Sequence, residues 1–219
     1  MPEGRFSQTV QASMPGMLLP EPITQALDWL ESSGAVEADR DGRLFASLYA
    51  GSQWGVPTGR SAIQFEPSLG GTWVSDAPEV SRRLNLFVRT GGDGSYAGLW
   101  RDDEGRLRFV HCGSGSGSTW MGVITDDAVQ FLRFLAIGYL DACWPEEHRL
   151  RPVEAYGACW GGDAEAPPFD PPLNFQRWLS QAFGVVIPET ASEVVETAPG
   201  MDDEASADPF WAWVRRVQA

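Results

Sequence analysis

Lysine is absent from the sequence, so all sixteen basic residues of the 219-residue chain are arginines. Without lysine the chain cannot form a Schiff base, a P-loop lysine contact with phosphate or a Ser–Lys catalytic pair. Thirty acidic residues face the sixteen arginines and give a formal net charge of −14. Because phosphate contacts need clustered basic side chains, we expect no direct binding of nucleic acid. The negative charge suits a basic partner, although an acidic, arginine-using proteome would also explain it.

Cysteine and histidine are scarce. Cys112, Cys143 and Cys159 show no CxxC or zinc-like spacing, and we expect buried, reduced thiols. The two histidines, His111 and His148, are too few for zinc, which needs three or four converging ligands. His111 and Cys112 are neighbours on a predicted strand, so their side chains point to opposite faces and cannot activate each other. We therefore expect no catalytic residue, no cofactor and no metal.

Long apolar runs and a secretory signal are also missing. No run approaches the roughly 18 apolar residues of a membrane span. Residues 1–22 lack the basic region and apolar stretch of a signal peptide. Hydrophobic residues make up 43% of the chain and aromatic residues 11%, as in a packed globular protein. We expect a cytoplasmic protein, a monomer or weak homodimer, that does not bind membranes.

Two glycine-rich stretches resemble phosphate-binding loops. GSGSGS at 113–118 lacks the lysine of a P-loop and the third glycine of a dinucleotide fingerprint. GDGSYA at 92–97 fits GxGxxA, but a predicted strand follows it instead of a helix. Glycine also lets a chain reverse between strands without strain. We therefore predict that both stretches are strand connections.

The sequence predicts a series of strands and helices, which fall into four regions along the chain. A β-hairpin is predicted where SYAGLWR (95–101) and RLRFVHC (106–112) flank the turn DDEG. Helices are predicted after Pro22, after a cap at Thr125, and at 174–184, 190–197 and 208–217, and strands at 44–51, 61–67, 71–76 and 83–90. The regions are a loose N-terminal arm (1–19), an α+β core (20–144), a Pro/Gly-rich loop (145–172) and a helical, acidic C-terminal extension packed on the core (173–219).

Acidic clusters and tryptophans supply the candidate partner-binding residues. The acidic clusters are 102–104 and 202–204. Neither has the spacing of an EF-hand calcium loop, and a solvated turn would also explain the first one. Most of the ten tryptophans are expected in the core, but some could line an interface, where tryptophan is enriched. The candidates are Asp102, Asp103, Glu104, Trp144, Trp160, Asp202, Asp203 and Glu204.

The segment RTGGDGSYAGLWRDDEGRLRFVHCGSGSGSTWMGVITDDAVQFLRFLAIGY (89–139) resembles the SMI1/KNR4, or SUKH, superfamily. The resemblance is an ordered series of a Gly/Asp turn, a strand with small and aromatic residues, an acidic turn, a strand with a V-H-x-G ending, and a helix with an FLxxLA core. These elements are Gly91–Gly94, Ser95–Trp100, Asp102–Gly105, Phe109–Gly113 and Phe131–Ala136. The residues from Pro145 onward lie outside the pattern.

The resemblance implies an α+β fold with a mainly antiparallel, curved sheet and helices packed around it. It also implies a bacterial immunity protein that binds and neutralises a toxin, often a nuclease or a deaminase. Eukaryotic members of the superfamily imply an alternative, a regulator or scaffold that binds an endogenous partner in cell-wall synthesis or signalling. A small-ligand or nucleotide-binding protein that uses the glycine loops is the third hypothesis.

Overall fold

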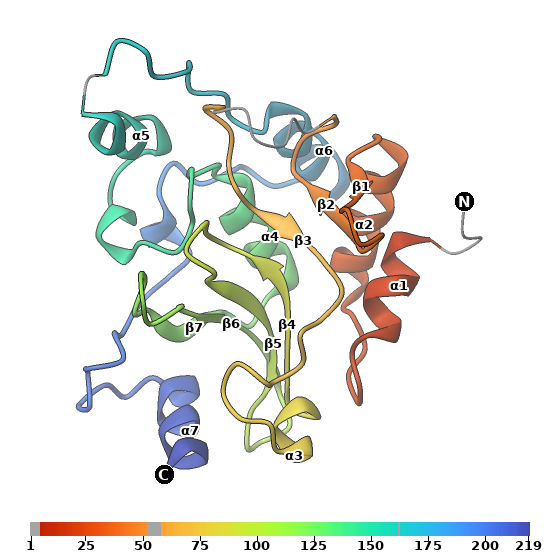
Figure 1. The fold of residues 1–219 in the computed structure, drawn as a ribbon, viewed down its shortest axis with the longest axis vertical. Helices are drawn as coiled ribbons and strands as arrows, with labels where there is room; N and C mark the ends of the chain where they lie inside the picture. Colours follow the sequence, from red (N-terminus) through yellow and green to blue (C-terminus); the bar gives the residue numbers. More distant parts are fainter. Residues whose placement is uncertain (1–4, 52–57, 162) are drawn as a thin grey trace.

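The computed structural model describes residues 5–51, 58–161 and 163–219. At its centre is a seven-stranded sheet in which each strand pairs antiparallel with its neighbours in the chain. The strand order therefore follows the sequence (Figure 1). The strands are β1 (Val36–Ala38), β2 (Leu44–Ser47), β3 (Gln64–Phe65), β4 (Leu84–Arg89), β5 (Tyr96–Arg101), β6 (Leu107–Cys112) and β7 (Met121–Thr125). The predicted α+β fold with a mainly antiparallel sheet is confirmed.

Seven α-helices in the described part of the chain surround the sheet. They are α1 (Phe6–Ala12), α2 (Glu21–Ser32), α3 (Pro78–Ser81), α4 (Ala128–Ala136), α5 (Pro152–Trp160), α6 (Leu173–Phe183) and α7 (Pro209–Gln218). Short 3-10 turns lie at Pro145–Glu147 and Ala191–Glu193. The predicted cap of α4 is wrong by two residues: Asp127 accepts from the Gln130 amide at 2.8 Å, while Thr125 ends β7.

One face of the sheet packs against α1, α2, α4 and α6. Phe87 and Phe109 lie next to Phe131 of α4, with ring centroids 6.5 and 4.3 Å apart. The buried stripe of α2 is made of Ile23, Ala26, Leu27 and Leu30, at the helical spacing that the sequence shows. This larger core explains why α1, α2 and α6 gather on one side of the molecule in Figure 1.

The opposite face packs against α7. Trp100 of β5 packs against both Phe210 and Trp213, at centroid distances of 5.3 and 5.6 Å. Each fully buried large apolar side chain contributes about 1.5–3 kcal/mol to folding. The cluster includes Leu84, Leu86, Trp100, Val110 and Met121 from the sheet and Phe210, Trp211, Trp213 and Val214 from α7. The C-terminal extension is thus packed on both faces of the sheet, with α6 on the first face and α7 covering the second.

Residues 194–208, which we call the strap, run along the free edge of β7. The Met121 amide donates to the Pro199 carbonyl at 2.9 Å, and the Met201 amide donates to the Thr119 carbonyl at 2.9 Å. A Cβ at Gly122 would lie 2.9 Å from Pro199 Cδ, so only glycine lets the strap come this close. The strap therefore satisfies backbone groups that an edge strand would otherwise expose.

Two β-bulges interrupt the long hairpins. The register shifts between Leu86 and Val88 in the β4–β5 pair, and between Phe109 and Val110 in the β6–β7 pair. A bulge bends its strand and increases the local twist. Both shifts therefore add local bending and twist to the strands that contain them.

Several expectations from the sequence are wrong. The arm at 1–19, described from residue 5 onward, contains α1, whose Phe6 and Val10 are fully buried. The loop at 145–172, apart from residue 162, which lies outside the described residues, contains α5. Residues 71–76 form turns instead of a strand, and the predicted helix at 190–197 is one 3-10 turn. Proline and glycine mark the ends of such elements as often as they mark loops.

Candidate functional site

The first acidic cluster, Asp102–Glu104, forms the tight turn between β5 and β6, and its leading residue is buried. The Asp102 carboxylate accepts from Nε of Arg106 and Nε of Arg108, each at 3.0 Å, and from the Glu104 and Arg106 amides. Burial opposes ionisation, but these donors outweigh it and hold the pKa of Asp102 well below its usual range. Asp102 is thus a structural carboxylate that shapes the turn.

The other two acids of this turn are also paired with arginines. Asp103 bonds Arg83 at 2.7 Å and Arg216 of α7 at 2.6 Å, and the carboxylate of Glu104 pairs with Arg106. The hydrogen bond from Arg83 lowers the pKa of Asp103. The turn 102–104 therefore presents little net negative charge to a partner.

The second cluster, Asp202–Glu204, lies on the strap and is exposed throughout. Within the described residues, these three carboxylates make no hydrogen bond or ion pair, and neither does that of Glu196. The acids at the two ends of the strap do have partners: Glu193, just before it, accepts from the Thr190 amide, and Asp208, its last residue, caps α7. The strap therefore carries four carboxylates that form no ion pair with any residue that the structure describes.

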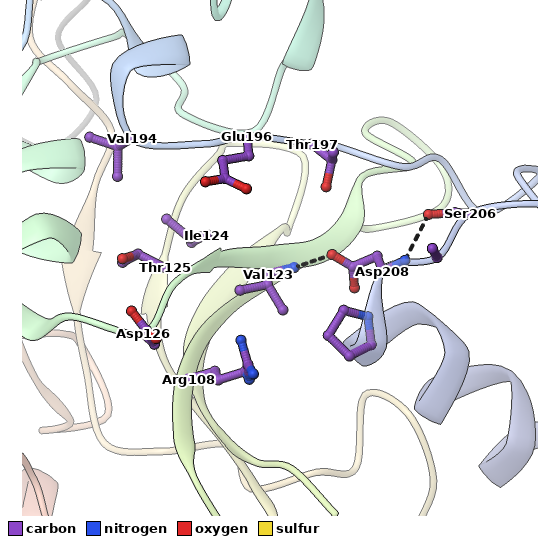
Figure 2. Close-up of a pocket in the computed structure, with 12 residues that line it drawn as sticks. Arg108, Val123, Ile124, Thr125, Asp126, Val194, Glu196, Thr197, Ser206 and Asp208 are labelled. Carbon is purple, nitrogen blue, oxygen red and sulfur yellow. Dashed lines mark hydrogen bonds between the residues drawn. The ribbon is translucent and has the colours of Figure 1, made fainter.

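A pocket of about 490 Å³ opens between the strap and β7. Across it, Glu196 and Thr197 on the strap face residues 123–125 of β7 and the following Asp126 (Figure 2). Asp208 closes one end, where its carboxylate accepts from the Val123 amide at 2.9 Å. Arg108 also reaches the pocket, but its charge is compensated by Asp102. Carboxylates and hydroxyl groups make this pocket suited to basic or hydrogen-bond-donating groups.

The two glycine loops are joined by Asp93. Its carboxylate accepts from the Ser95 and Ser114 hydroxyls at 2.8 and 2.7 Å and from the Ser118 amide at 2.8 Å. Although burial opposes it, this bonding lowers the pKa of Asp93 to about 2. A Cβ at Gly117 would lie 2.7 Å from the Asp93 carboxylate, so glycine is needed there. The loop groups that could hold a phosphate are occupied by a carboxylate of the chain, and both loops connect strands as predicted.

The histidines and cysteines lie in structural surroundings. His111 is fully buried; Nδ1 donates to the Trp120 carbonyl at 3.0 Å, and Nε2 accepts from the Thr90 hydroxyl at 2.9 Å. Burial lowers the pKa of His111 to about 3 and that of His148 to about 4, so both are neutral at pH 7. Burial raises the pKa of the Cys112 and Cys143 thiols.

Cys159 on α5 is exposed, which contradicts the expectation that all three thiols are buried. Its position follows from the structure of residues 152–160, which form a surface helix instead of the predicted loop. Only two residues of α5, Ala155 and Tyr156, are buried. A cysteine in this stretch therefore has a low chance of reaching the core.

Neither of the two candidate tryptophans is part of the strap. Trp144 is half-buried before the 3-10 turn at 145–147, and Trp160 ends α5 and packs on Tyr156 at 6.0 Å. Figure 1 shows α5 and α7 at opposite ends of the molecule. The structure therefore does not bring the eight candidates together, and only Asp202, Asp203 and Glu204 form an uncompensated exposed group.

Three residues of interest were missed by the sequence analysis. Glu196 and Asp126 line the same pocket, although 70 positions separate them in the chain. Trp73 lies beside the Gly/Ser loop and is 39% exposed. The run of acids between Arg177 and Arg215 is a sequence feature that includes Glu196. No pattern in the sequence distinguishes Trp73 from the buried tryptophans.

No protein-family model, curated protein or solved structure matches the chain. The resemblance of residues 89–139 to the SMI1/KNR4 superfamily thus stays a prediction from the residues. In the described ranges there is no group of three or more His, Cys, Asp or Glu side chains placed to hold a metal ion. None of the helices described is long and apolar enough to cross a membrane.

Proposed function

We propose that this chain is a non-enzymatic, immunity-type protein that binds a toxin in the cytoplasm and neutralises it. The observation that carries the proposal is the strap, whose carboxylates at Glu196 and Asp202–Glu204 have no partner among the described residues. Selection for folding alone gives no reason to keep like charges together on one exposed segment, because they repel each other. A basic partner provides that reason.

The toxin in this proposal is a nuclease or a nucleic-acid deaminase. Such enzymes hold phosphates with basic clefts, and a negative surface is steered toward a basic one. An inhibitor that occupies the cleft competes with the nucleic acid for the same basic side chains. The resemblance of residues 89–139 to the SMI1/KNR4 superfamily supports this toxin class, and the net charge of −14 supports the mode of binding.

The surroundings of the reactive groups support binding over catalysis. A general base must reach its substrate, whereas His111 is fully buried and uses both ring nitrogens within the core. The Cys143 thiol lies beside the Asp93 carboxylate, and burial and this charge raise its pKa, which disfavours the nucleophilic thiolate.

The test is a growth competition in the native cells. A strain that lacks this chain is grown in contact with its parent, which still delivers the toxin. We expect the deletion strain to be killed by contact and to be rescued by the wild-type chain. A deletion strain that grows normally beside its parent contradicts the proposal. Impaired growth of the deletion strain on its own would support binding of an endogenous cell-wall or signalling partner instead.

Charge-reversed variants, used in the same growth competition, test whether the strap is the surface that binds the toxin. We expect the triple variant Asp202→Arg, Asp203→Arg, Glu204→Arg to rescue poorly. The matched control reverses three exposed acids elsewhere, Asp41→Arg, Asp163→Arg and Glu165→Arg, so that both variants have the same net charge. Equal rescue by the two variants would remove the strap from the binding surface.

A further inference from the structure

A hollow of about 580 Å³ lies where the strap, the loop before α3 and the Gly/Ser loop meet. Trp73, Met121, Met201 and Trp211 supply its apolar lining, and residues 113–115 of the Gly/Ser loop form one wall. We call it the Trp73 hollow. Its lining is aromatic and methionine side chains, the types that interfaces favour and that adapt to varied apolar partners.

The aromatic walls of the Trp73 hollow are held in place before any partner arrives. Nε1 of Trp73 donates to the Gly113 carbonyl at 3.1 Å, and its ring packs on Tyr96 at 5.8 Å. Nε1 of Trp211 donates to the Asp203 carbonyl at 2.9 Å. Side chains that are already fixed lose little conformational entropy on binding, so more of the contact free energy is available for affinity. Trp73 is nevertheless 39% exposed, which leaves its ring accessible to a partner.

The rim of the hollow is negative. Asp202, Asp203 and Glu204 follow Met201 directly, and the bond from Trp211 to the Asp203 backbone holds them at this side of α7. One cation is close by: Arg215 lies 5.6 Å from the Trp211 ring and donates to the backbone carbonyl of Glu204, not to its carboxylate. Three carboxylates against one guanidinium leave the rim with a negative balance.

We propose that the Trp73 hollow is the anchor point of the toxin interface and receives an apolar side chain flanked by arginine or lysine. The identity of the partner as a toxin rests on the function proposed above, whereas the recognition of an apolar side chain among basic ones rests on the hollow and its rim. Interfaces commonly place an aromatic-lined pocket inside a polar rim, and the buried anchor supplies most of the affinity. The charged rim contributes speed of association and rejects acidic surfaces.

The test is a titration of the full chain, labelled with ¹⁵N, with three capped pentapeptides followed by NMR. The first peptide is Arg-Arg-Leu-Arg-Arg, the second has Ser in place of Leu, and the third has Glu in place of every Arg. Each peptide is added up to about 5 mM, so that binding with a millimolar Kd is detected. We expect only the first peptide to shift the indole signals of Trp73 and Trp211. No shift of these signals, or equal shifts with the Ser peptide, would overturn the proposal.

Two variants locate the binding. We expect Trp73→Ser to raise the Kd of the first peptide by about tenfold or more, as loss of a hot-spot residue does. Leu69→Ser is the matched control, because Leu69 is on the same loop and is also 39% exposed; an equal effect of both variants would overturn the proposal.

Peptide binding without protection in the growth competition would refute only the toxin function. Protection that survives Trp73→Ser would refute only the hollow as its anchor.

Discussion

The tripeptide Asp-Asp-Glu occurs twice in this chain, at 102–104 and at 202–204, and the two copies have opposite surroundings. In the first copy, four arginines from three parts of the chain bond the carboxylates. In the second copy, the carboxylates face solvent without such partners in the described residues. The same letters thus build a turn in one place and an available charged surface in the other, and the positions of the arginines decide which.

The largest expected difference between the copies is in stability. Asp102→Asn leaves Arg108, which is only 18% exposed, without its charged partner. We expect this change to lower the free energy of unfolding by about 2–4 kcal/mol. Asp202→Asn should change it by less than about 0.5 kcal/mol, as exposed substitutions usually do. Urea unfolding of both variants measures the difference, and similar values would show that the two copies are equivalent.

A smaller effect on stability is expected at Asp93, whose carboxylate, like that of Asp102, is bonded within the chain. The pKa of Asp93 falls from 3.8 to about 2 on folding, so the unfolded chain takes up the proton first as pH falls. This contribution to stability is present above about pH 4 and is lost as pH approaches about 2. It amounts to about 2 kcal/mol at most, because the side chain is partly solvated.

Asp93→Asn should remove this pH dependence. The free energy of unfolding, measured in urea at about pH 5 and about pH 2.5, should fall less with acidification in the variant than in the wild type. Asp202→Asn again serves as the control and should keep the full pH dependence. An unchanged slope in Asp93→Asn would mean that the serine donors do not stabilise the ionised carboxylate.

For the rate of association, the second copy of the tripeptide should matter more than the first, which is the reverse of the order expected for stability. Reversing Asp202, Asp203 and Glu204 to Arg should slow binding to a basic toxin domain by about tenfold at low salt, because steering depends on uncompensated charge. Reversing Asp103 and Glu104 should change the rate less, since arginines already offset their charge. Stopped-flow mixing at two salt concentrations measures this, and an equal slowing by both variants would contradict the comparison.

The smallest effect is expected from releasing one arginine. Arg216→Gln removes the bond to Asp103 between two side chains that are each about 60% exposed. Such a surface pair contributes about 0.5 kcal/mol or less. The variant should therefore stay folded while its first acidic turn gains uncompensated charge. If thermal unfolding shows a much larger loss, α7 depends on this contact more than its apolar face suggests.

Part of this comparison could be predicted from the sequence. Arg106 and Arg108 follow the first copy within six residues, and in a hairpin they are close enough to bond it. Arg83 and Arg216 are 20 and 113 positions from Asp103, so only the fold brings them there. The hairpin, α6 and α7 were predicted because their turn, cap and periodicity are local features.

The rest depends on contacts that no local pattern contains. The strap lies along β7 through the backbone of Pro199 and Met201, and backbone hydrogen bonds leave little trace in side-chain identity. Gly122 is a residue of β7 whose type the strap requires, but a glycine inside a strand has several possible explanations. The Trp73 hollow likewise depends on segments that are far apart in the chain, from the loop before α3 to α7.

The strap also has a consequence for how the chain is made. Strands β1 to β7 leave the ribosome well before residues 194–219, so the nascent sheet has an open β7 edge and an uncovered apolar face until these residues have been made. Until then the partly made chain is exposed to edge-to-edge aggregation. Dependence on chaperones should therefore be greatest just before the tryptophans of α7 emerge.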